Sequence, residues 1–152
     1  MSNRRLAREA ALRALFQVDV GQSDPDEALA YNTHELAVPE TAADFSRLLV
    51  LGTLEHLSEI DALIGQYTVG WSVERLPRTD RVVLRLAVFE LDQLRDQVPV
   101  AVVINEAVEL AKMYGDATSG RYVNGILSSI ASALKRNDDG ERGKRSVPRA
   151  IQ

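Results

Sequence analysis

Cysteine is absent from this sequence of 152 residues, histidine occurs only at His34 and His56, and aromatic residues make up 5%. Without cysteine the chain forms no disulfide, thiolate metal site or thiol nucleophile, a usage that fits the reducing cytoplasm. No apolar run reaches the roughly 18 residues of a membrane span, and no apolar segment follows the basic N-terminus as in a secretory signal. We therefore expect a cytoplasmic protein that does not enter a membrane.

Sequence motifs of catalysis are also missing. The chain has no HExxH zinc motif, no glycine-rich phosphate loop and no nucleophilic serine elbow. Glu106 and Glu109 lie three residues apart, but the Glu-x-x-His pairs that a di-iron bundle needs do not occur. Glu109 with Lys112 is more simply a pair of opposite charges on a helix surface. The sequence thus predicts a protein that is not an enzyme and holds no metal or cofactor.

The net charge of −4 is unevenly distributed. Residues 1–13 carry Arg4, Arg5, Arg8 and Arg13 against Glu9, a local charge of +3, and residues 137–152 carry +1, which leaves −8 on the body. Arginines in a first helical turn oppose the helix dipole, so they do not stabilise their own helix. The asymmetry indicates an anionic ligand at the N-terminal end, with a solvated helix start as the alternative.

Apolar residues at three- and four-residue spacings predict an all-α fold of about seven helices. We expect helices over 3–20, after the Asp24-Pro25 cap, over 40–66 in one piece, briefly within 70–77, over 78–95, from VPVAVVI to Gly115, and over 119–135. The 78–95 segment is apolar nearly all round, which is typical of a buried central helix. Gly52 indicates close packing with another helix.

The predicted helices form a single domain over residues 1–136. An N-terminal bundle is expected over about 1–66 and a C-terminal bundle over about 72–136, packed against each other. Residues 137–152 lack apolar periodicity and are expected to form a disordered tail.

Two segments pair arginine with an aromatic residue. On the first helix Arg5, Arg8 and Phe16 lie beside the alanine-rich core stripe, where arginine suits phosphate and an exposed ring suits a base. On the last helix Arg121 and Tyr122 follow a capping residue, Ser119, in the first turn, where free N–H groups favour anions. The adjacent Asn124-Gly125 pair would allow a backbone or ligand to approach. Together the two segments predict a binding surface for single-stranded RNA if the two helix starts lie side by side, with Phe16 as a core residue the alternative.

Four stretches of the sequence resemble the NusB family of transcription antitermination factors. They are RRLAREAALRALFQ, DRVVLRLAVFEL, VPVAVVINEAVELAKMYG and SGRYVNGIL, in matching order and spacing over about residues 3–135. The resemblance implies two small helical bundles, binding of boxA-type RNA from ribosomal RNA leader transcripts, and a heterodimer with the small-subunit ribosomal protein NusE. It also implies that this pair joins an antitermination complex on RNA polymerase.

The resemblance implies two sets of site residues. The RNA-binding set is Arg4, Arg5, Arg8, Phe16, Ser119, Arg121 and Tyr122. The partner-binding set is Glu74, Arg78, Asp80, Arg81 and Arg85, although Arg85 could equally form an internal ion pair. Leu6 interrupts the family's arginine cluster, and Thr118 stands where the family can carry an acidic residue.

Three alternatives stay open at this stage. One is a helical protein–protein adaptor without an RNA role. Another is a regulatory domain like that of some RNA methyltransferases, but the sequence has neither a methyl-donor loop nor reactive cysteines. A homodimer that buries the arginine-rich helix is also possible.

Overall fold

The computed structural model describes the backbone of residues 2–151 and the side chains of residues 2–140. Over this range the chain is helical and contains no strand, as expected. The helices are α1 (Asn3–Gly21), α2 (Pro25–Glu35), α3 (Glu40–Glu55), α4 (Leu57–Gly65), the short 3-10 helix η1 (Val73–Arg75), α5 (Arg78–Gln93), α6 (Val100–Tyr114) and α7 (Ser119–Ile151). None of the described helices is both long and apolar enough to cross a membrane.

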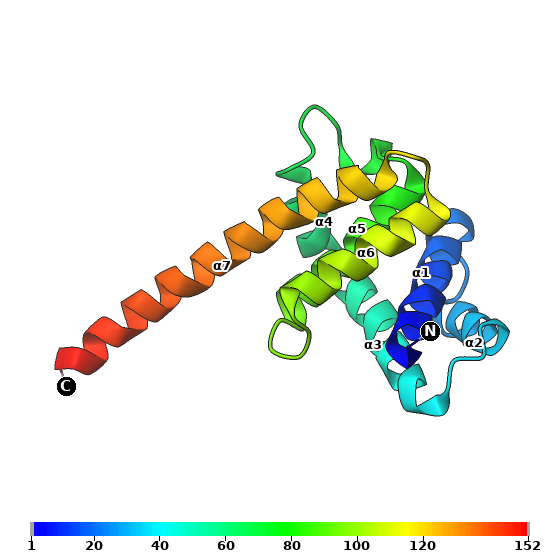
Figure 1. Ribbon diagram of the computed structural model, residues 1–152, viewed down its shortest axis with the longest axis horizontal. Coiled ribbons are helices and arrows are strands. Elements are labelled where there is room, and N and C mark those ends of the chain that lie inside the picture. Colours follow the sequence, from blue (N-terminus) through cyan, green and yellow to red (C-terminus); the bar gives the residue numbers. More distant parts are fainter. Residues whose placement is uncertain (1, 152) are drawn as a thin grey trace.

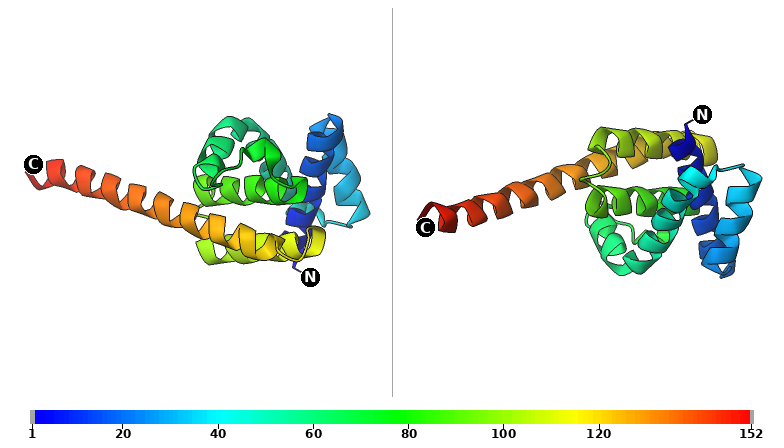
Figure 2. Two further views of the ribbon diagram at one scale, coloured as in Figure 1. Left: turned by 90° about the horizontal axis from the view of Figure 1, so that it is seen from above. Right: turned by 90° about the horizontal axis from the view of Figure 1, so that it is seen from below.

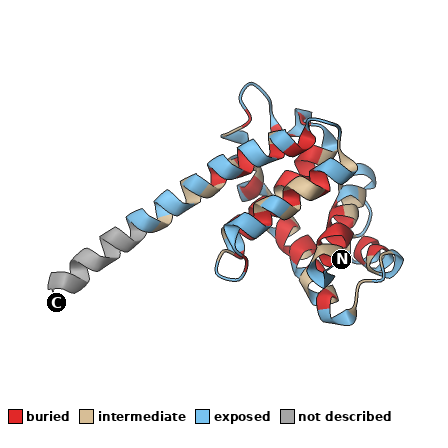
Figure 3. Cartoon of the chain, in the orientation of Figure 1, coloured by how far each residue is buried: buried red, intermediate tan, exposed pale blue. Residues whose placement is uncertain are grey.

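Helix α5 is the buried centre of the fold, as its apolar pattern predicts. It packs against α1, α3, α4, α6 and α7, so each of its faces meets another helix. Leu84 and Val88 are fully buried, and Figure 3 shows the buried positions concentrated where the helices cross. Burial of these apolar side chains stabilises the fold and fixes where the surrounding helices sit.

Helices α6 and α7 form an antiparallel pair beside α5 (Figures 1 and 2). The valine-rich start of α6 is helical rather than extended, as predicted, and Pro99 occupies the N-cap position. Val103 and Ala107 of α6 are buried together with Val123 and Leu127 of α7. The tight α6–α7 connection therefore lies at one end of this pair, close to α1.

The segment predicted as one helix over 40–66 is two helices, so that prediction is wrong. The break is at His56, whose φ of −101° and ψ of 17° leave the helical region. The His56 ring stacks on Phe89 of α5 with centroids 6.0 Å apart. Gly52, one turn earlier, also lies against the Phe89 ring, because a Cβ at this position would overlap Phe89. The bend lets α3 and α4 both follow the surface of α5, and it confirms the close packing predicted for Gly52.

Helix α7 continues to Ile151, past residue 136 where the sequence predicts a disordered tail. The backbone of 137–151 therefore differs from that prediction, while Gln152 lies outside the described residues. An ion pair between Arg95, after α5, and Asp138 of α7 holds the start of this extension. The division into two bundles stays a prediction: α4, expected in the first bundle, packs against α5 and α7.

Candidate nucleic-acid interface

In the first turn of α1, Arg4 is exposed, whereas Arg5 forms an ion pair with Glu106. Ser2 caps the helix by accepting the N–H of Arg5 at 3.1 Å. The Arg4 side chain is exposed, and its guanidinium lies 4.3 Å from the ring centre of Phe45. Arg5 donates from Nε and Nη2 to both carboxylate oxygens of Glu106 on α6, at 2.9 and 3.1 Å. These hydrogen bonds raise the pKa of Arg5, whose side chain is still 38% exposed.

Arg8 is not available at the surface. Its side chain is 4% exposed and donates from Nε and Nη2 to Glu90 of α5, at 3.1 and 2.9 Å. Burial raises the pKa of Glu90, and the hydrogen bonds and charge of Arg8 oppose that rise. Arg8 therefore forms an ion pair inside the core, where both charges are compensated, and its RNA contact stays a prediction.

Phe16 is 36% exposed and lines a surface groove of 440 Å³ between α1, α2, the start of α5 and the end of α6. Tyr31 of α2 and Tyr114 of α6 line the same groove. The ring is thus accessible from solvent, as a base platform requires, rather than enclosed in the core.

A polar cluster that the sequence did not predict lies beside Phe16. Arg13 donates from Nε to the Tyr114 hydroxyl at 2.8 Å, and that hydroxyl donates to the buried Glu9. Burial and the hydrogen bond to Glu9 raise the pKa of Tyr114. The only sequence signal was the four-residue spacing of Glu9 and Arg13, because Tyr114 lies 105 and 101 positions away from them in the chain.

Asp116 organises the start of α7. Its carboxylate accepts the N–H and the hydroxyl of Thr118, both at 2.9 Å, and these bonds lower the pKa of Asp116. Ser119, predicted to cap the helix and contact RNA, is 1% exposed, and its Oγ accepts the N–H of Asp116 at 3.0 Å. Gly115 is required here because a Cβ would overlap Ser119. Ser119 is therefore a structural residue of the α6–α7 turn.

Arg121 and Tyr122 line a second groove of 640 Å³, together with Tyr67, Trp71 and Asp80. Arg121 is exposed and has no carboxylate partner among the described side chains. Burial first, and then the charge of Asp80, raise the pKa of Tyr122. The Asn124-Gly125 pair brings no backbone close, since a Cβ at Gly125 would meet open space.

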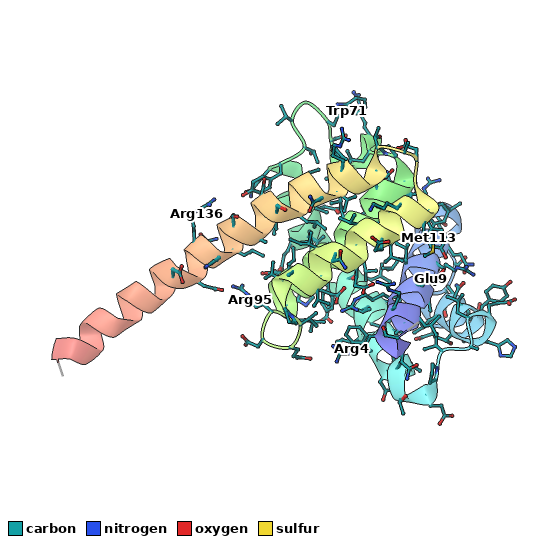
Figure 4. The ribbon with its side chains drawn as sticks, in the orientation of Figure 1. Arg4, Glu9, Trp71, Arg95, Met113 and Arg136 are labelled. Carbon is teal, nitrogen blue, oxygen red and sulfur yellow. The ribbon has the colours of Figure 1, made fainter. Side chains whose placement is uncertain are left out.

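The two segments predicted to bind RNA do not meet at their helix starts. Arg5 is tied to Glu106 in the middle of α6, whereas α7 begins beyond Tyr114, about 12 Å further along that helix. In Figure 4, Arg4 lies well away from Trp71, which marks the second groove. The Arg13–Tyr114 cluster lies between them, so any shared surface must run along α1 and the end of α6.

Asp19 at the end of α1 gathers three of the predicted partner-binding arginines. Its carboxylate accepts hydrogen bonds from Arg78 at 2.9 Å, Arg81 at 2.6 Å and Arg85 at 3.1 Å. Arg85 also donates to both oxygens of Asp61 at 2.8 Å, which is the internal ion pair weighed as its alternative. Burial raises the pKa of Asp19, but the three arginines outweigh it and the pKa is lowered.

Only two of the predicted partner-binding residues are exposed. Glu74 and Arg78 are exposed, whereas Asp80 and Arg81 are buried at 5% and 8% exposure. One oxygen of Asp80 and the Nε of Arg81 have no hydrogen-bond partner in the described part of the chain. No group of acidic or histidine side chains within residues 2–140 is arranged to hold a metal ion.

These features define a small all-helical protein whose candidate site is a basic and aromatic surface. The chain belongs to the NusB family, whose family model matches residues 5–132. It is 45% identical over 127 residues to the transcription antitermination protein NusB of Desulforamulus reducens, covering 84% of this chain and 88% of that protein. It is 46% identical over 141 residues to the protein of the same name from Symbiobacterium thermophilum, covering 88% and 92%.

Solved structures agree with this assignment. NusB from T. maritima superimposes with a TM-score of 0.79 at 41% identity, covering 87% of this chain and 92% of that one. A chain from a crystal structure of the antitermination factors NusB and NusE in complex with dsRNA superimposes with a TM-score of 0.79 at 33% identity, covering 88% and 98%.

Proposed function

We propose that this protein is an RNA-binding transcription antitermination factor. It binds boxA-type RNA of ribosomal RNA leader transcripts together with NusE, and the pair joins the antitermination complex on RNA polymerase. The observation that carries this proposal is the family match, which spans both α1 and the first turns of α7. A related chain in a structure with NusE and dsRNA supports the same kind of partners.

The exposed arginines are the phosphate contacts in this proposal. Arg4 and Arg121 are exposed with no carboxylate partner among the described side chains, so they bind phosphate without first breaking an ion pair. Arg5 must exchange Glu106 for phosphate or share its guanidinium between the two. Phe16 and Tyr122 stack with or pack against bases. Arg8 and Ser119 act indirectly, by holding α1 on α5 and by shaping the α6–α7 turn.

Glu74 and Arg78 are the direct contacts with the protein partner in this proposal. Both are exposed near the start of α5, where Arg78 also donates to Asp19. Arg81 and Arg85 act indirectly, because their hydrogen bonds to Asp19 hold the first half of α5 against the end of α1. One buried oxygen of Asp80 has no hydrogen-bond partner in the described part of the chain, which is energetically costly. Asp80 contacts the partner in this proposal if the partner donates a hydrogen bond to that oxygen.

Fluorescence anisotropy tests the RNA part of the proposal. A labelled boxA-like RNA and a scrambled RNA of equal length are titrated with the protein, with and without NusE. We expect selective binding that tightens when NusE is present. Equal weak binding to both RNAs, unchanged by NusE, would contradict it and favour the adaptor alternative.

Charge reversal tests the partner surface. We expect Glu74→Lys combined with Arg78→Glu to weaken NusE binding in calorimetry while RNA binding without NusE is retained. Glu55→Lys, at an exposed position at the end of α3, is the matched control and should bind NusE as the parent does. Unchanged NusE binding by the double variant would remove these two residues from the interface.

A further inference from the structure

The groove beside Phe16 has the features of a built site. Its lining includes six side chains from α1, α2 and α6, namely Arg13, Phe16, Gln17, Tyr31, Asn32 and Tyr114. At 440 Å³ it has room for one nucleotide base with its sugar, and too little for a folded segment of protein. Its α1 wall is continuous with the proposed RNA-binding surface.

The upper walls of this groove are aromatic and accessible. Phe16 is 36% exposed and Tyr31 is 58% exposed. Within the described residues these two rings are not stacked on each other, although they line the same groove. Exposed aromatic rings on either side of a groove offer a stacking surface to any unpaired base.

The floor of the groove holds two coupled amides with unused hydrogen-bonding groups. Asn32 is 1% exposed, and its Nδ2 donates to the Ala28 carbonyl at 2.8 Å and to Oε1 of Gln17 at 3.2 Å. The Ala28 carbonyl only accepts, so it fixes which end of the amide is the nitrogen. Among the described side chains and backbone, nothing donates to Asn32 Oδ1, and Gln17 Nε2 donates to nothing. The groove therefore offers one acceptor and one donor side by side.

A positive charge is fixed at the rim. Arg13 is 39% exposed, and its Nε is held by the Tyr114 hydroxyl at 2.8 Å, while an Nη lies 3.5 Å from Glu9. The hydrogen bond with Tyr114 raises the pKa of Arg13. A guanidinium held in this way is oriented before any ligand arrives, which lowers the entropic cost of binding phosphate.

We propose that this groove binds one unstacked nucleotide of the RNA, with its base against Phe16 and Tyr31, its edge on the Asn32–Gln17 amides and its phosphate beside Arg13. The inference rests on the proposed RNA-binding function and extends the RNA surface to α2. A base edge that carries a donor next to an acceptor, as adenine does, matches this amide pair.

Scanning the RNA with abasic positions tests the subsite. The boxA-like RNA is synthesised with one base removed at a time, and each version is titrated with the parent protein and with Tyr31→Ala. At one position we expect base removal to weaken parent binding about 5- to 100-fold. Tyr31→Ala should weaken binding of the intact RNA by a similar factor and lose all further sensitivity to that one position.

Two controls separate the outcomes. His34→Ala, on an exposed position of α2 outside the groove, should show the parent's pattern, and Tyr31→Phe should restore it. Circular dichroism establishes that each variant is folded. If Tyr31→Ala keeps the parent's full sensitivity at every position, the subsite is overturned while RNA binding stands. If the parent binds no RNA, the proposed function itself fails.

Discussion

Arg8 of α1 and Glu90 of α5 form a bidentate ion pair in the interior, with side chains only 4% and 3% exposed. The Arg8 guanidinium also lies 5.2 Å from the ring centre of Phe45 on α3. One arginine thus joins α1 to α3 and to the central helix. This pairing gives the basic N-terminal helix a fixed position from which Arg4 and Arg5 reach the surface.

Arg8→Met should destabilise the protein by about 3–5 kcal/mol, because Glu90 would be left buried without a compensating charge. Urea unfolding followed by circular dichroism measures the change. The loss should be smaller at pH 5 than at pH 7.5, since an unpaired Glu90 is relieved of its charge by protonation. The double variant Arg8→Met/Glu90→Leu should recover most of the stability. A single variant of unchanged stability that has lost RNA binding would instead make Arg8 a direct RNA contact.

Asp19→Asn should cost about 1.5–3 kcal/mol at pH 7, because the carboxylate accepts charged hydrogen bonds from Arg78, Arg81 and Arg85. The pKa of Asp19 is lowered from its ordinary value of 3.8, so its stabilising contribution is complete above that value. The contribution is lost as pH falls through the lowered pKa. Unfolding free energies measured from pH 7 to pH 2 should therefore show parent and variant converging only in acid.

Asp44→Asn is the matched control for Asp19, because Asp44 is exposed and makes no ion pair within the described side chains. It should leave the unfolding free energy within about 0.5 kcal/mol of the parent at every pH. A gap between parent and Asp19→Asn that persists unchanged at pH 2 would show that the loss is not electrostatic.

Gly52→Ala should destabilise the fold even though alanine favours helix. Overlap of the new Cβ with Phe89 should cost about 1–3 kcal/mol, against a helix gain of about 1 kcal/mol. The midpoint of thermal unfolding is measured for Gly52→Ala and for Gly125→Ala as its comparison. At Gly125 the added Cβ meets open space, so stability should rise. Adding Phe89→Leu to Gly52→Ala should relieve part of the loss. If Gly52→Ala were as stabilising as Gly125→Ala, the close α3–α5 packing would be refuted.

Most of the fold could be predicted from the sequence because helical periodicity and caps are local. The Asp24-Pro25 start of α2 and the all-round apolar pattern of α5 are such signals, and both are confirmed. The break at His56 was missed because it depends on the Phe89 ring, which another helix supplies. The extension of α7 was missed because apolar periodicity, the signal used to predict helices, ends before Asp138.

The site was harder to predict because an arginine's role depends on which carboxylate it meets. Arg4 and Arg8 lie in one short basic run, yet one is exposed and the other is bound to Glu90, 82 positions away in the chain. Residues Arg78, Arg81 and Arg85 were expected at a partner surface, but all three converge on Asp19. Sequence spacing predicted most of the helices, while pairing across the fold decided which charges remain free.

The most direct test of phosphate binding by the exposed arginines is the salt dependence of RNA binding by the double variant Arg4→Gln/Arg121→Gln. With Arg4, Arg5 and Arg121 on phosphates, the parent's log affinity should fall with log salt at a slope of about −2. Losing two of these contacts should make the slope shallower by about 1.4 and weaken binding at low salt.

Lys135→Gln/Arg136→Gln removes the same charge from exposed positions of α7, and Figure 4 shows Arg136 far from Arg4. Anisotropy titrations at several salt concentrations should give this control the parent's slope. We expect a shallower slope for the Arg4→Gln/Arg121→Gln variant alone. Equal slopes for all three proteins, or an equal loss in both variants, would contradict this expectation.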